Sequence, residues 1–146
     1  FNARGSAKRK LYRYTILNRD FPSALSFRRS WFIPHKLDFA AMRRAAKYLK
    51  GEHDFTSFRA GNCNAKSPIR TMDRVELFKQ NGFLQFEFEG KGFLKHMVRN
   101  FVGTLVYVGK KKFPAKQVKT ILEARNRRQA GPTAPPEGLC LIKVEY

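Results

Sequence analysis

The stretch from Lys91 to Val108 constrains the fold most, because its apolar residues recur at the spacing of an α-helix. The residues that share one side of this helix are Leu94, Val98, Phe101, Val102, Leu105 and Val108. The other side carries Lys95, His96, Arg99, Asn100 and Thr104. The pattern predicts a helix that begins at Phe93, buries its apolar side and holds Arg99 at the boundary of the core.

Strand and helix signals alternate around this helix. A strand pattern over Lys10–Asn18 puts Tyr12, Tyr14 and Ile16 on one face. Three further segments follow the same rules: a helix capped by Asp38 and ended by Gly51, a helix that opens at Pro114, and a closing strand over Leu139–Tyr146. A strand hairpin joins Arg70–Lys79 to Phe83–Glu89 through Asn81-Gly82, with Leu84, Phe86 and Phe88 buried and Gln85, Glu87 and Glu89 facing water.

This order of elements is typical of one α+β domain over residues 1–146, with an antiparallel or mixed sheet backed by helices. Residues 52–69 read as a loop, long enough to suggest a function. The outward face of the helix after Asp38 carries Arg43, Arg44, Lys47 and Lys50. A solvated helix face explains these four cations better than RNA contact does, and both interpretations stay open.

The charge of the chain is strongly unbalanced. Thirty Lys and Arg residues stand against 11 Asp and Glu, a formal net charge of +19. Such an excess favours a polyanion, above all nucleic acid, as the partner. A membrane partner is the weaker interpretation because no basic amphipathic helix or lipidation signal is present. Two cysteines without a zinc or disulfide spacing favour a reducing compartment, hence the cytoplasm.

The residues alone indicate no cofactor. His35, His53 and His96 are scattered without a second ligand at metal-binding spacing, so no metal site is expected. No Gly-rich phosphate loop or dinucleotide motif occurs. None of the four aspartates stands out as a nucleophile. Because neither a metal site nor a nucleotide-binding motif is indicated, a cofactor-free activity, or none, is expected.

Five segments, in order and without a large insertion, give the chain an end-to-end resemblance to a known family. They are FNARGSAKRKLYRYTILN, LKGEHDFTSFRA, CNAKSPIR, GKGFLKHMVRNFVGTL and TAPPEGLCLIKVEY. The chain resembles the tRNA pseudouridine synthases of the TruA type. The resemblance implies a pseudouridine-synthase-like fold and a cofactor-free isomerase that acts on uridines 38 to 40 in the anticodon stem-loop of tRNA. It also implies a homodimer.

The family's essential aspartate lies between Arg-Thr and Ala-Gly, in the half that precedes the segment matched here, and that motif does not occur in these 146 residues. The chain begins at Phe1, in mid-pattern, so we expect a piece of a longer protein that is inactive alone. Arg70-Thr71-Met72-Asp73 is superficially similar to the motif but is displaced and lacks Ala-Gly. We interpret Asp73 as a decoy on the hairpin.

Two residues acquire roles through the resemblance. Tyr12 matches the family's active-site tyrosine, which stacks on the target uracil, and Arg99 matches the arginine that pairs with the catalytic aspartate. Without the resemblance, Tyr12 would be a half-buried strand aromatic and Arg99 a surface cation. Candidate RNA-binding cations cluster around Tyr12 and the CNAKSPIR loop: Arg4, Lys8, Arg9, Lys10, Arg13, Arg59, Lys66 and Arg70.

Two other classes of function remain open at this point. The chain is either catalytic in this way or a non-catalytic RNA-binding or ribosome-associated relative that has lost the catalytic half. A basic structural domain without an RNA role is the weaker third interpretation. An in-frame Arg-Thr-Asp-Ala-Gly upstream of Phe1 would favour the enzyme.

Overall fold

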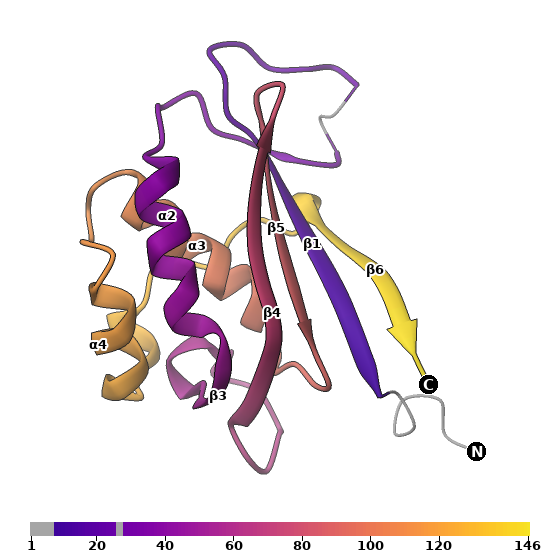
Figure 1. Ribbon diagram of the computed structural model, residues 1–146, viewed down its shortest axis with the longest axis vertical. Helices are drawn as coiled ribbons and strands as arrows, with labels where there is room; N and C mark the ends of the chain where they lie inside the picture. Colours follow the sequence, from indigo (N-terminus) through magenta and orange to yellow (C-terminus); the bar gives the residue numbers. More distant parts are fainter. Residues whose placement is uncertain (1–7, 26–27) are drawn as a thin grey trace.

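The computed structural model describes residues 8–25 and 28–146. Six strands form one sheet, and the helices α2, α3 and α4 lie together on one of its faces (Figure 1). The strand order is β2-β1-β5-β4-β3, with β6 paired to β1 beside β2. The bounds are β1 Arg9–Leu17, β2 Trp31–Phe32, β3 Gly51–Asp54, β4 Ile69–Gln80, β5 Phe83–Gly90, β6 Leu139–Glu145, α2 Phe39–Ala46, α3 Met97–Gly109 and α4 Gln117–Ala124.

Strand β1 lies in the middle of the sheet. It pairs antiparallel with β5 from Lys10↔Gly90 to Leu17↔Phe83, and antiparallel with β6 on its other side. Its last two residues pair in parallel with β2. The sheet is therefore mixed, and the predicted α+β architecture is confirmed.

The hairpin of β4 and β5 also agrees with the prediction. Asn81 and Gly82 have φ values of 50° and 83°, the left-handed backbone that a tight hairpin turn requires. Leu84, Phe86 and Phe88 are buried against the helices. The prediction that Glu87 faces water was wrong: it is 7% exposed because Arg13 and Arg74 cover its carboxylate on the outer face of the sheet.

Helix α3 differs from its prediction at one end and on one side. It begins at Met97, not Phe93, because His96 has a φ of 61°, which an α-helix cannot contain. Its apolar stripe is buried as predicted, yet Asn100 and Thr104, expected on the polar side, are each 1% exposed. Residues 131–134 cover that side: Gly131 N donates to Thr104 Oγ1 at 2.9 Å.

The remaining helices complete the core. Asp38 caps α2 through a 3.0 Å bond from Ala41 N, as predicted. Helix α4 begins at Gln117 after a turn that starts at Pro114, three residues later than predicted, and buries Val118, Ile121 and Leu122. The segment predicted as a loop after Gly51 opens with the short strand β3, which four residues of cross-strand pairing to β4 stabilise. Phe55 and Phe58 follow it and are fully buried.

Candidate active site

A pocket of about 330 Å³ lies beside β1, next to the start of α3. Three stretches of chain form its walls: the first half of β1, the segment that links β5 to α3 together with the first turn of α3, and the approach to β6. The lining residues are Lys10, Tyr12, Phe93, Leu94, Lys95, His96, Met97, Val98, Arg99, Pro136 and Leu139. The structure thus brings together Tyr12, Arg99 and Lys10, which the sequence singled out.

Tyr12 forms the aromatic wall of the pocket. The alternation of β1 places it on the same face as the buried Tyr14, in the first half of the strand, where it is only half-buried. The ring of Phe93 meets it edge-on, with 4.9 Å between the centroids and 81° between the planes. Burial raises the pKa of Tyr12, so the phenol is protonated at neutral pH. An apolar ring held in this way can stack on a base.

Arg99 lies across the pocket on the first turn of α3. Its Nε donates to the carbonyl oxygen of Ala134 at 2.7 Å, and Ala134 N donates to the Arg99 carbonyl oxygen at 3.0 Å. This pair of bonds ties Arg99 to residues 131–134. In the described part of the chain, no carboxylate forms an ion pair with Arg99 and none lines the pocket. Both terminal nitrogens therefore remain able to bind an anion.

A buried hydrogen-bond network holds residues 131–134 against α3. Asn100 Oδ1 accepts from Arg127 Nη2 at 3.0 Å and from Thr133 Oγ1 at 2.6 Å, while Asn100 Nδ2 donates to Phe58 O at 2.7 Å. Arg127 Nη1 donates to Gly131 O at 2.7 Å. The network fixes the carbonyl that orients the Arg99 guanidinium. The sequence signal for it was a single asparagine inside an apolar helix.

His96 is a pocket residue that the sequence reasoning did not assign to the site. Burial, followed by the nearby Arg99, Lys95 and Arg127, lowers the pKa of His96 below its ordinary value of 6.5. The imidazole is thus neutral at pH 7 although the pocket is basic. Its position three residues before Arg99 was the available signal, but its place at the pocket depends on the left-handed backbone.

The other candidate RNA-binding cations lie in several environments. Arg4 lies outside the described residues. Lys8 and Lys66 are exposed, whereas Arg9 forms an ion pair with Asp73 at 3.4 Å. Arg13 binds Glu87 with both Nε and Nη2, at 2.9 and 2.7 Å.

Arg59 and Arg70 both support the CNAKSPIR loop. Arg59 Nη2 donates to Cys63 O and Ala65 O, and Arg70 Nη1 donates to Ser67 O and Ile69 O. Asp73, the expected decoy, does not line the pocket.

No group of three His, Cys, Asp or Glu side chains within residues 8–25 and 28–146 could hold a metal ion. In the same ranges, no helix is long and apolar enough to span a membrane.

Comparison with known proteins identifies the family of the chain. A family model described as tRNA pseudouridine synthase matches residues 45–146. The chain is 49% identical over all 146 residues to the tRNA pseudouridine synthase A of Acetivibrio thermocellus, and 46% identical to that of Ehrlichia canis. It spans about 60% of the length of each of these relatives. The chain belongs to the tRNA pseudouridine synthase family.

Proposed function

We propose that the intact protein isomerises uridine to pseudouridine at positions 38 to 40 in the anticodon stem-loop of tRNA, without a cofactor. The observation that carries this proposal is the convergence of Tyr12 and Arg99 on one pocket that holds cations and, among its described lining residues, no carboxylate. Tyr12 supplies a face for the base, and Arg99 supplies a partner for the missing anion.

The reaction breaks the bond between ribose C1′ and uracil N1 and forms a bond between C1′ and C5. N1 gains a proton and C5 loses one, so atoms and charge balance. The uracil must first leave its stack in the RNA, and the ring of Tyr12 replaces that stacking. Because the Tyr12 phenol is protonated, it acts as a stacking partner and hydrogen-bond donor rather than as a ready base.

Arg99 binds the catalytic aspartate, which lies outside the described residues. An adjacent guanidinium lowers the pKa of a carboxyl group and orients it through charge-assisted hydrogen bonds. Ala134 O already takes up Nε, so the carboxylate meets the terminal nitrogens. The aspartate stays ionised for its attack on the nucleotide.

We also propose that the intact protein is a homodimer in which one tRNA contacts both subunits, and the family resemblance supports this. We propose further that it works in the cytoplasm. The unpaired Cys63 and Cys140 agree with this location, since a reducing compartment keeps thiols free.

The test incubates the intact protein with a tRNA that carries uridines at positions 38 to 40, and maps pseudouridine by mass spectrometry. We expect conversion at one or more of these positions without added cofactor, and none from residues 1–146 alone. An intact protein that binds tRNA but forms no pseudouridine would favour the non-catalytic RNA-binding relative instead.

A further inference from the structure

The cations of the chain are distributed unequally over its surface. On the outer face of the sheet they are neutralised: Arg9 pairs with Asp73, Arg13 with Glu87, Arg74 with Glu76, Glu87 and Glu89, and Lys143 with Glu145. Five of the 11 acidic residues of the chain take part in these ion pairs. The positive excess must therefore lie elsewhere.

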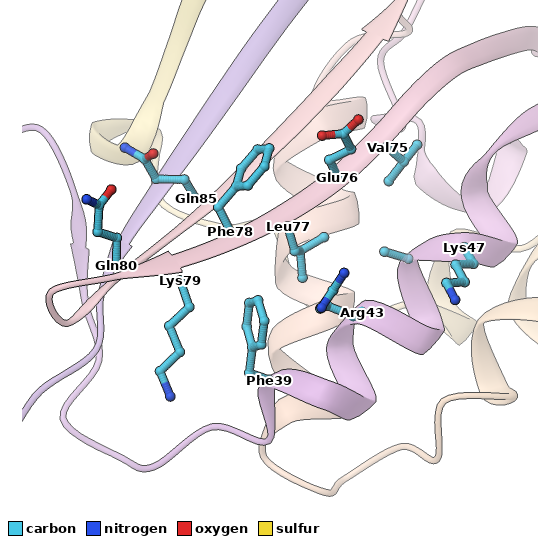
Figure 2. A pocket seen from close by; sticks show the side chains of 11 residues that line it. Phe39, Arg43, Lys47, Val75, Glu76, Leu77, Phe78, Lys79, Gln80 and Gln85 are labelled. Carbon is cyan, nitrogen blue, oxygen red and sulfur yellow. The ribbon is translucent and has the colours of Figure 1, made fainter.

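A second group of cations surrounds the free edge of β4 and the start of α2. Two adjoining hollows, which share Phe39 and Lys79, have volumes of about 640 and 520 Å³. Figure 2 shows the larger hollow, with Arg43 reaching from α2 toward Leu77 in β4 and with Phe39 and Lys79 at one end. We name their six cations the distal basic surface: Lys36, Arg43, Lys47, Lys79, Lys110 and Lys111.

The charge of this surface is not neutralised within the described ranges. None of its six cations forms an ion pair with a described carboxylate. The two acidic residues that line the hollows are engaged, since Asp38 caps α2 and Glu76 binds Arg74. A group of cations without internal carboxylate partners favours an anionic ligand.

The edge of β4 adds hydrogen-bond donors to these charges. Strand β3 pairs with β4 only from Ile69 to Met72, so in the described part of the chain the edge beyond Met72 pairs with no strand. Backbone N–H groups and Lys or Arg side chains are the groups that contact phosphate oxygens in nucleic acids. Phe39, half-buried between the hollows, supplies an apolar surface for ribose or base.

The distal basic surface lies at the far end of α3 from the candidate active site. Arg99 is on the first turn of α3, while Lys110 and Lys111 follow its last residue. Lys110 is eleven positions after Arg99, which corresponds to about 17 Å along the helix at 1.5 Å per residue. Consecutive phosphates of one strand of double-stranded DNA are about 3.4 Å apart along its axis, and at a spacing of that order one nucleic acid that reaches both places extends over roughly five nucleotides.

We infer that the distal basic surface is a second RNA-binding surface, which holds the phosphate backbone of the same tRNA remote from the modified uridine. The inference rests on the proposed function for the identity of the RNA. It assigns Lys36, Lys79 and Lys111 to affinity for the body of the substrate and no part to the chemical step.

The test compares two triple variants of the intact protein by the salt dependence of tRNA binding. One variant replaces Lys36, Lys79 and Lys111 with Gln; the control replaces three exposed lysines outside the surface, Lys50, Lys116 and Lys119. The slope of log K against log salt is negative, and each lost phosphate contact reduces its magnitude by about 0.7 to 0.9. We expect the magnitude of the slope to fall by about 2 to 3 in the distal variant and by less than about 1 in the control, although both variants lose three positive charges.

Two readouts complete the test. The distal variant should raise KM for tRNA and leave kcat unchanged at saturating tRNA. In the wild-type protein, tRNA should protect Lys36, Lys79 and Lys111 from acetylation more than it protects the control lysines. Equal slopes for the two variants, or equal protection of the two sets, would overturn the inference. If the wild type forms no pseudouridine, the proposed function fails, but the slopes and the protection still decide this point.

Discussion

Tyr12 illustrates how one side chain serves both the fold and the proposed site. Its ring forms a T-shaped contact with the ring of Phe93, and the side chain lines the pocket. Stacking between a base and an aromatic side chain contributes about 1 to 3 kcal/mol. Tyr12→Ala in the intact protein should therefore lower kcat/KM for tRNA by roughly 5- to 150-fold, measured by initial rates of pseudouridine formation.

The conservative variant Tyr12→Phe should remain much closer to the wild type, because it keeps the stacking face. Tyr146→Ala is the matched control, since Tyr146 is exposed and lies outside the pocket. A large loss in Tyr12→Phe would show that the hydroxyl takes part in the chemistry, and an unimpaired Tyr12→Ala would remove the residue from the site.

The lowered pKa of His96 predicts that the stability of the fold depends on pH. Burial and three neighbouring cations lower its pKa in the folded state, so as the pH falls below about 6.5 the unfolded chain binds a proton before the folded chain does. The free energy of unfolding should therefore decrease over this range. Urea unfolding at pH 7.5 and 5.5, with NMR titration of the His96 imidazole, measures both effects.

His96→Gln removes this titration and is the control for it. The difference in unfolding free energy between pH 7.5 and 5.5 should be smaller in His96→Gln than in the wild type. A titration midpoint of His96 above 6.5 in the folded protein would contradict the environment described here.

At the scale of residues, the sequence supplied candidates and the fold supplied their partners. Tyr12 and Arg99 were identified through family resemblance, whereas periodicity alone made them ordinary strand and helix residues. The bond from Arg127 to Asn100 joins residues 27 positions apart. Such a contact leaves no periodic signal, so the network behind Arg99 could not be predicted.

At the scale of elements, α3 and residues 131–134 pack too closely for any side chain at Gly103. A Cβ there would overlap the carbonyl oxygen of Pro132, a backbone atom that can yield only if the segment moves. Gly103→Ala should therefore lower the free energy of unfolding by about 3 kcal/mol, measured by urea denaturation. It should also lower kcat, because Ala134 O would no longer orient Arg99.

Gly109→Ala in the same helix is the matched control. Its Cβ would meet Met42 Sδ at 2.6 Å, an atom of a flexible side chain rather than of the backbone. We expect a loss of about 1 kcal/mol or less, partly offset by the higher helix propensity of alanine. Equal losses in the two variants would show that residues 131–134 do not constrain α3.

The elements themselves were largely predictable, and their ends were not. The repeat of apolar residues located β1, the β4–β5 hairpin and the core side of α3, because burial of one face dictates that repeat. The predicted start of α3 was wrong because the left-handed backbone of His96 interrupts a helical pattern that is continuous in the sequence. Strand β3 was missed because four residues carry too short a pattern and are stabilised by pairing with β4.

At the scale of the whole molecule, the fold separates paired from unpaired charge. The sequence showed a net charge of +19. Only the sheet revealed that ion pairs neutralise the outer face while the candidate active site and the distal basic surface keep their cations. Pairing across strands depends on register, which composition does not contain.

The central claim is that Arg99 serves the chemical step through an anion that it binds in the pocket. Single-turnover conversion of saturating tRNA by the intact protein tests it most directly, with Arg99→Ala compared against the wild type and against Arg128→Ala, an exposed arginine outside the pocket. Removal of one preorganised charge partner typically costs 10²- to 10³-fold in rate. We predict a loss of about that size or larger for Arg99→Ala, with tRNA affinity within about threefold of the wild type and Arg128→Ala near normal in rate. A wild-type rate in Arg99→Ala would contradict the account.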